Sequence, residues 1–280
     1  MRTAFDEGHQ TILDHNGGLT TLNITTVLPL RDSPDFAVCT VNVGDSLTYI
    51  FSKRYGMNEL SIGSHDINEE RDIRDAGGAI GPVNGKKPHL TNLTFSVTTC
   101  EPGDIVFLTT DGISDNFDPV VTKIAVPGKK DSELTSVGAK AEMLPHERHL
   151  FSMKGMEMII HEYELLTEVD ISAQELCTAL SEHVSTLTEQ KRAIIQNPEL
   201  YNRKFRLKEK RKMEERIKME LRGIPGKLDH ATVIAYESGI YRGEDMSNYL
   251  ECSSNSDSTR TSSVSSNMEP VSSTMFESNV

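Results

Sequence analysis

The sequence predicts an α+β fold on three observations. Residues 1–126 are dense in short apolar runs punctuated by Gly, Asn and Asp, a pattern typical of strands joined by tight turns. Residues 171–188 and 198–222 instead show helix-like patterns. Residues 231–236 return to the character of a strand. Strands on both sides of a helical stretch indicate a mixed α+β chain.

The first part of the chain predicts a helix followed by a hairpin. Residues 4–13 form the helix that precedes the first strands. Residues 36–43 and 47–51 are strand-like runs that flank Gly44-Asp45-Ser46. Because Gly-Asp supplies the unusual backbone angles of a tight turn, these two runs are expected to pair as a β-hairpin.

Three later segments predict strands of different burial. Leu93, Phe95 and Val97 alternate with polar residues, as expected for a half-buried strand. Residues 105–108 are apolar at every position, so that strand is expected to be covered on both faces. Residues 231–236 look like a second covered strand.

The helix-like segment at residues 198–222 is strongly basic in an otherwise acidic chain. Its apolar residues fall on one face at multiples of four, and Gly223 and Pro225 end it; they are Phe205, Met213, Ile217 and Leu221. The favoured interpretation is a solvated helix with one packed face. Contact with an acidic lipid surface, a nucleic acid or a partner helix is the alternative.

Composition and charge narrow the classes of function that this chain can have. The chain has 280 residues, 36% of them hydrophobic and 25% charged, which supports a packed core. No window approaches the roughly 18 apolar residues of a membrane span, and the first residues do not resemble a signal peptide. Four cysteines without Cys-x-x-Cys spacing are expected to be reduced thiols, so we expect a cytoplasmic or nuclear location. The net charge of −13 argues against nucleic acid as a partner and suits hard cations.

Aspartates beside predicted strand ends suggest a metal site. Asp45 lies in the predicted hairpin turn, Asp111 follows one covered strand, and Asp229 precedes the other. If these last two strands are antiparallel neighbours, Asp111 and Asp229 project from the same sheet edge, and Asp115 returns toward them if the loop turns. Carboxylate oxygens are ligands that Mg²⁺ and Mn²⁺ favour. Structural Asp residues in turns are the alternative.

Five segments in order resemble the metal-dependent protein phosphatases of type 2C, the PPM-type phosphatase domain. They cover about half of the chain and read Gly17-Gly18-Leu19-Thr20-Thr21, Val41-Asn42-Val43-Gly44-Asp45-Ser46, Ala76-Gly77-Gly78, Gly103-Asp104 through Phe107 to Thr110-Asp111-Gly112-Ile113-Ser114-Asp115, and Leu228-Asp229-His230-Ala231-Thr232-Val233-Ile234. The resemblance implies an αββα sandwich of two antiparallel sheets flanked by helices, partial here. Composition adds a helical insertion and a disordered C-terminal tail.

The resemblance also implies site residues and chemistry. Asp111 and Asp229 would bind one metal of a catalytic pair, and Asp45, Asp111 and Asp115 would surround a weaker site. The ions would be Mg²⁺ or Mn²⁺. The implied reaction is hydrolysis of phosphoserine and phosphothreonine in phosphoprotein substrates by a metal-bound hydroxide.

The chain also departs from the family pattern. The family's acidic motif and Asp-Gly-His-Gly-Gly motif are absent, so no catalytic residue is assigned, and His9 is interpreted as structural. We therefore expect the 280-residue chain alone to have little phosphatase activity. A catalytically incomplete pseudophosphatase or truncated isoform, acting as a binding or regulatory module, is the alternative.

The expected domain organisation follows from these segments. Residues 1–242 would form the phosphatase domain without its N-terminal motifs, with a helical insertion at 127–226. Residues 243–280 are Ser-rich and would form a disordered tail. Ser278-Asn279-Val280 resembles a C-terminal ligand of PDZ domains.

Overall fold

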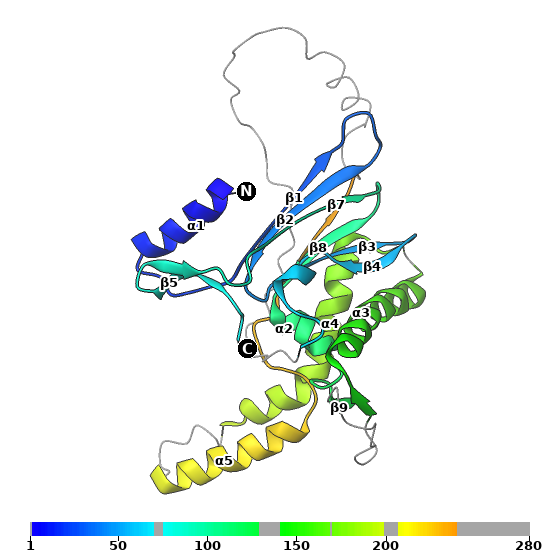
Figure 1. The fold of residues 1–280 in the computed structure, drawn as a ribbon. Helices are drawn as coiled ribbons and strands as arrows, with labels where there is room; N and C mark the ends of the chain where they lie inside the picture. Colours follow the sequence, from blue (N-terminus) through cyan, green and yellow to red (C-terminus); the bar gives the residue numbers. More distant parts are fainter. Residues whose placement is uncertain (1, 70–74, 129–140, 169, 199–206, 240–280) are drawn as a thin grey trace.

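The computed structural model describes residues 2–69, 75–128, 141–168, 170–198 and 207–239 (Figure 1). Two antiparallel sheets lie face to face at its centre. The first has the strand order β1-β2-β7, and the second has the order β11-β8-β3-β4. Their bounds are β1 (Leu22–Pro29), β2 (Phe36–Val43), β7 (Thr94–Cys100), β11 (Val233–Glu237), β8 (Ile105–Thr109), β3 (Leu47–Ser52) and β4 (Gly56–Glu59).

Apolar and hydroxyl side chains fill the space between the two sheets. Val38 of β2 and Cys100 of β7 pack against Ile50 and Val106 of the second sheet. Toward one end the contact becomes polar, where Thr48 Oγ1 donates a hydrogen bond of 2.9 Å to the Asn23 side chain. The sheets are therefore joined by an apolar cluster at one place and by hydrogen bonds between polar side chains at another.

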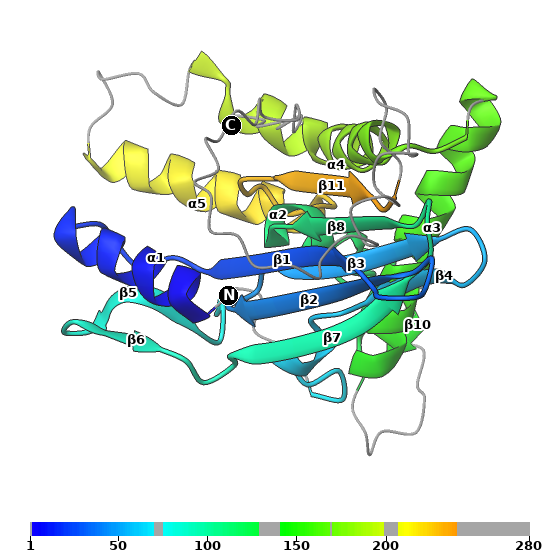
Figure 2. The same cartoon turned by 90° about the horizontal axis from the view of Figure 1, so that it is seen from above.

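Helices α3 (Pro145–Thr167) and α4 (Ala173–Ile195) cover the other face of the four-stranded sheet (Figure 2). The largest apolar cluster lies there and includes Phe107, Met156 and Leu180, all nearly inaccessible to solvent. Helix α4 begins at a capping box, because the side chains of Ser172 and Glu175 each bind the other's backbone N–H. The predicted helix at 171–188 is thereby confirmed, whereas α3 was not predicted.

Helix α1 (Arg2–Asp14) packs on the hairpin of β5 (Ala79–Asn84) and β6 (Lys87–His89). His9 joins the two, because its Nδ1 accepts a hydrogen bond of 2.9 Å from the Gly81 N–H and its Nε2 lies 3.2 Å from the Lys86 carbonyl oxygen. The interpretation of His9 as structural agrees with these contacts.

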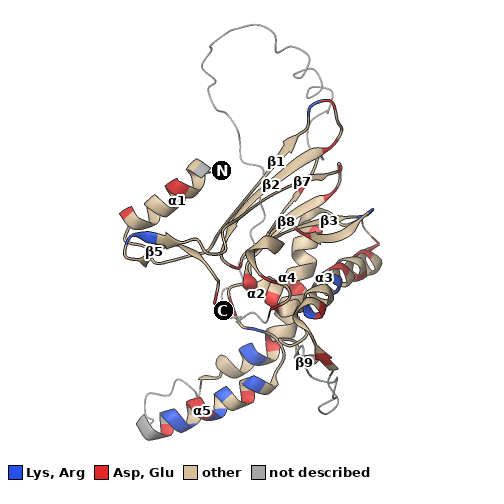
Figure 3. Ribbon diagram, in the orientation of Figure 1, with Lys and Arg blue, Asp and Glu red and all other residues tan. Residues whose placement is uncertain are grey.

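The remaining elements are short, apart from α5 (Leu207–Gly223). They are η1 (Ile62–Ser64), α2 (Asp111–Ser114), η2 (Asp115–Phe117), β9 (Ala125–Pro127) and β10 (Ala141–Met143). Basic and acidic residues are interleaved along α5, which extends away from the sheets (Figure 3). Among its described residues, Met213, Ile217 and Leu221 are half-buried, as the predicted helical face requires.

The predicted hairpin between residues 36–43 and 47–51 is wrong. These runs are β2 and β3, and they belong to different sheets. The Asn92 side chain accepts from the Gly44 N–H and donates to the Gly44 carbonyl oxygen, both at 3.0 Å, so this turn is held by a neighbouring loop. The chain thus crosses from one sheet to the other at Gly44, whose φ is +102°.

Two burial predictions also need correction. In β7 the alternation is present, but Phe95 and Val97 point outward and are 64% and 60% exposed. Strand β11 is covered on one face only, because Val233 is buried whereas Ile234 and Tyr236 on the other face are 36% and 53% exposed. Strand β8 is buried at nearly every position, as predicted.

The predicted fold class is confirmed: the protein is an α+β sandwich of antiparallel sheets with flanking helices. The expected tail at 243–280, including Ser278-Asn279-Val280, lies outside the described residues. In the described part of the chain, no helix has both the length and the apolar character that crossing a membrane requires.

Candidate metal centre

Three of the four predicted aspartates surround one lysine. The Lys227 ammonium forms ion pairs with Asp111 Oδ2, with Asp115 Oδ2 at 2.9 Å and with Asp229 Oδ2 at 3.2 Å. We call Asp111, Asp115 and Asp229 the aspartate cluster. Asp111 and Asp229 therefore converge at one sheet edge, each within ion-pair distance of the same ammonium group.

The end of β8 places two members of the cluster. The chain leaves this strand at Thr109 and begins α2 at Asp111, so that carboxylate lies in the first turn of the helix. Asp115 follows four residues later, at the start of η2. Residues four apart on a helical turn share a face. The turn back toward Asp111, expected if the loop bends, is thus made by a short helix.

Strand β11 brings the third aspartate to the same edge. Strands β8 and β11 are antiparallel neighbours, with Thr109 opposite Val233. Beyond this pair, the Thr110 hydroxyl donates to the His230 carbonyl oxygen at 2.8 Å and accepts from the Thr232 N–H at 3.0 Å. A Cβ on Gly112 would overlap the His230 carbonyl, so only glycine allows α2 to approach the Asp229 segment this closely.

Asn116 fixes the backbone of Lys227. Its fully buried side chain donates hydrogen bonds to the carbonyl oxygens of Gly112, at 2.7 Å, and Lys227, at 3.0 Å. It also accepts one of 2.7 Å from the Lys227 N–H. One amide side chain thus joins the helix that carries Asp111 to the segment that carries Asp229.

The aspartate cluster is arranged to stabilise a positive charge. Burial by itself would lower the pKa of the Lys227 ammonium, but Asp115 and Asp111 outweigh it and raise this pKa above its ordinary value. The Lys227 side chain is only 17% exposed. Because the ion pairs are largely shielded from solvent, they are stronger than those of a surface lysine.

Asp45, the fourth predicted residue, lines an adjoining hollow of about 230 Å³ together with His65, Asp66 and Asp75. A second hollow, of about 100 Å³, reaches from Asp115 to Glu59, His65 and His149. His65 and Asp66 border both hollows, so the two hollows adjoin.

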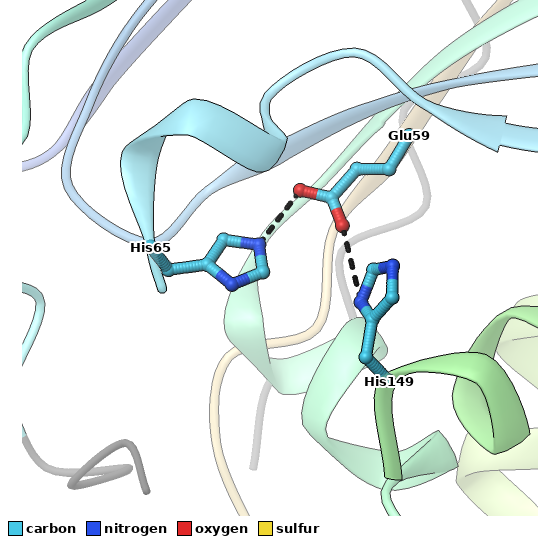
Figure 4. Close-up of side chains that lie close together, drawn as sticks. All are labelled: Glu59, His65 and His149. Atoms are coloured by element: carbon cyan, nitrogen blue, oxygen red, sulfur yellow. Dashed lines mark hydrogen bonds and ion pairs between the residues drawn. The ribbon is translucent and has the colours of Figure 1, made fainter. Parts of the chain in front are cut away.

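Sequence reasoning missed Lys227, although a signal was present. Lys227 and Asp229 are two residues apart, and side chains at such spacing lie on the same side of an extended chain. It also missed the group formed by Glu59, His65 and His149, which no sequence spacing indicates (Figure 4).

Comparisons with known proteins support the resemblance. No protein-family model matches the sequence. The chain is 57% identical over 133 residues to a PP2C-like domain-containing protein of Drosophila melanogaster, CG9801, a match that covers 47% of this chain and 19% of that protein. The chain therefore spans about a fifth of the length of this relative.

One solved structure shows a weak likeness. It is the phosphatase domain of the cell fate determinant SpoIIE from Bacillus subtilis, with 13% identity, coverage of 78% of this chain and 56% of that one, and a TM-score of 0.32. A likeness at this level does not define the fold. The Drosophila relative is the stronger finding, and with it the predicted resemblance to type 2C phosphatases is confirmed over about half of the chain.

Proposed function

We propose that this chain contributes the aspartate cluster of a Mg²⁺- or Mn²⁺-dependent serine/threonine phosphoprotein phosphatase. One observation carries the proposal: carboxylates from two separate segments converge on a single cationic group. The 57% identical relative with a PP2C-like domain supports the choice of reaction class.

The ligand types of the cluster suit a divalent ion. Asp111, Asp115 and Asp229 supply hard oxygen ligands of the kind that Mg²⁺ and Mn²⁺ favour, and Asn116 fixes their spacing. A bound divalent ion would polarise phosphoryl oxygens and acidify a neighbouring water. Lys227 occupies the centre of the three carboxylates, so the ion would compete with its ammonium group.

Lys227 also supports a second candidate function. If the Lys227 ammonium stays between the three carboxylates, it supplies the positive charge there and no metal ion is needed. The chain would then be a metal-independent binding module that retains the sandwich without the hydrolysis. The three ion pairs of Lys227 favour this second function, because one ammonium group already neutralises part of the charge of all three carboxylates.

Calorimetric titration with Mn²⁺ tests the proposed metal centre. For the metal-dependent phosphatase, we expect Asp111→Asn and Asp229→Asn each to weaken Mn²⁺ binding at least tenfold, Asp111→Asn the more strongly. Lys227→Met should strengthen binding, because it removes the competing ammonium. Asp35→Asn, a change in the β1–β2 connection outside the cluster, is the matched control. Equal Mn²⁺ affinity in wild type and Asp111→Asn would contradict the metal assignment.

Turnover of a phosphopeptide tests the reaction class. Any Mn²⁺-dependent release of phosphate should be lost in Asp229→Asn and kept in Asp35→Asn. If neither the wild type nor Lys227→Met binds Mn²⁺, the binding module becomes the supported function.

A further inference from the structure

A second group of possible metal ligands lies beside the aspartate cluster. Glu59 ends β4, His65 follows η1, and His149 lies in the second turn of α3, and the three side chains point toward one another (Figure 4). We call these residues the histidine cluster. They come from a strand, a loop and a helix that are joined only by the tertiary fold.

The spacing of the ligand atoms suits a small metal ion. Glu59 Oε1 lies 2.9 Å from His65 Nε2, and Glu59 Oε2 lies 3.6 Å from His149 Nδ1. One ligand atom from each residue lies within 4.8 Å of the other two. Tetrahedral ligands about 2.1 Å from a shared zinc ion are about 3.4 Å apart, so little movement is needed to bind one.

The carboxylate is buried and held in place. The Glu59 side chain is 2% exposed, and Glu59 Oε1 accepts a hydrogen bond of 3.0 Å from the Ser61 hydroxyl. Ser61 is itself fixed, because its oxygen accepts from the Thr48 N–H of β3 at 3.0 Å. A support of this kind around a ligand orients it and raises metal affinity.

The cluster has an accessible side. The imidazoles of His65 and His149 are 19% and 16% exposed, and all three residues line the hollow that also reaches Ser114 and Asp115. An ion held here by three protein ligands would keep a fourth position open to this hollow. Three protein ligands and one open position are the arrangement of catalytic zinc sites.

We propose that Glu59, His65 and His149 form a zinc-binding site beside the aspartate cluster. Two imidazole nitrogens favour Zn²⁺ over Mg²⁺ or Mn²⁺, which prefer sites made of oxygen ligands. The two clusters thus select different metals. This site does not depend on the proposed phosphatase reaction.

A structural alternative makes a different prediction. The same three residues would simply attach α3 to β4 through hydrogen bonds between one carboxylate and two imidazoles. In that case Zn²⁺ has no preferred place here, and replacement of either histidine changes stability without changing metal affinity.

Calorimetric titration of the metal-free 280-residue chain with Zn²⁺ distinguishes the two. We expect one tightly bound Zn²⁺ per chain, with affinity at least a hundredfold lower in His149→Gln and in His65→Gln. Ser61→Ala removes the hydroxyl that holds Glu59 and binds the Thr48 N–H but removes no ligand, and it should weaken Zn²⁺ binding about tenfold. The matched control is His146→Gln, an exposed histidine three residues away on α3, which should leave Zn²⁺ affinity unchanged.

Co²⁺ used as a visible probe gives a second measurement. Four-coordinate Co²⁺ absorbs strongly in the visible, and we expect this band in wild type and Asp229→Asn but not in His149→Gln. If the band is lost in Asp229→Asn but kept in His149→Gln, the ion lies in the aspartate cluster and the proposal is overturned. Equal Zn²⁺ affinity in the wild type and in the His65→Gln/His149→Gln double variant would also overturn the proposal. If circular dichroism shows that a histidine variant is unfolded, the wild-type Co²⁺ spectrum decides, because absence of the band rejects the site.

Discussion

The aspartate cluster and the histidine cluster border one hollow, yet they are built in different ways. The first consists of three carboxylates around a lysine of the same chain, and it forms where two neighbouring strands end. The second places one buried carboxylate between two imidazoles and needs a helix that packs on the sheet. One depends on strand pairing and the other on the helical layer.

The two clusters are also held in place by different contacts, which we call their supports. Residues 110–116 and 227–232 hold the aspartates through hydrogen bonds between adjacent backbone segments. The histidine cluster depends on how the first turns of α3 attach to Asp118, the residue after η2. Arg148 donates to the Asp118 carboxylate from both Nε and Nη2. A substitution in one support should therefore disturb its own cluster more than the other, although η2 also carries Asp115.

The largest effect is expected for Asp118→Ala. Both Arg148 and Asp118 are mostly buried, with side chains 10% and 19% exposed, so removal of the carboxylate leaves a shielded guanidinium without this partner. We expect a loss of about 3 kcal/mol in the free energy of unfolding, measured by urea denaturation. Zn²⁺ affinity should fall because His149 directly follows Arg148 on α3. Mn²⁺ affinity should fall less, because Asp118 only follows the short helix that begins with Asp115.

The control for Asp118→Ala is Lys154→Ala, which breaks an exposed ion pair with Glu157 on the same helix. This variant should lose less than about 1 kcal/mol. If Asp118→Ala weakened Mn²⁺ and Zn²⁺ binding equally, the two supports would not be separate.

The second prediction is the converse of the first, because the substitution lies in the support of the aspartate cluster. Gly112→Ala forces α2 away from the His230 carbonyl and so separates Asp111 from Asp229. We expect a loss of about 2 kcal/mol in the free energy of unfolding and at least tenfold weaker Mn²⁺ binding, with Zn²⁺ binding unchanged. Gly223→Ala, where the added Cβ meets nothing within 4 Å, is the matched control. Wild-type Mn²⁺ affinity in Gly112→Ala would show that the close approach is not needed.

The same contrast explains what could be predicted from the sequence. Asp111 and Asp229 could be predicted because they lie beside strand-like runs, where local pattern and chain direction restrict their position. Asp115 follows Asp111 by four residues, so a bend in the loop brings it back. Glu59 and His149 are ninety residues apart and meet only through packing of α3 on the sheet. The helix itself was missed, since its apolar residues surround it: Met156 and Ile160 are buried, whereas Leu150 and Leu165 are exposed.

The errors in the strands have a related cause. Alternation in β7 correctly indicates two faces, but it does not say which face meets the other sheet, and Phe95 and Val97 lie on the outer one. Two strand-like runs joined by Gly44-Asp45-Ser46 are compatible with a hairpin within one sheet. They are equally compatible with a crossing from one sheet to another. The crossing is selected by Asn92, forty-eight residues away, which binds the backbone of Gly44.

The third prediction concerns the lysine at the centre of the aspartate cluster. Asp115 and Asp111 raise the pKa of Lys227 in the folded chain, so its ion pairs stabilise the fold fully below pH 10.5, the ordinary lysine value. This stability is lost as the pH rises through the folded pKa. We expect the wild type to lose more stability above pH 10.5 than Lys227→Met does. Parallel urea-denaturation profiles for the two proteins would contradict this role.

The smallest effect concerns His183, which stacks on Phe117 and so joins α4 to the element that begins with Asp115. Burial lowers the pKa of His183, and the charge of Glu162 offsets this only in part. Because the folded chain then binds fewer protons than the unfolded chain, stability is fully present at pH values above 6.5 and falls as the pH drops below that value. We expect His183→Gln to be less stable than the wild type at pH 7.5, through lost packing, but to lose less further stability down to pH 5. The difference in the free energy of unfolding between the two proteins, measured by urea denaturation, should therefore become smaller as the pH falls.

Mn²⁺ and Zn²⁺ affinities at pH 7.5 should both stay within twofold, since His183 belongs to neither cluster. A difference in stability that is constant with pH would mean that His183 titrates alike in the folded and unfolded chains, and that its burial has no electrostatic cost.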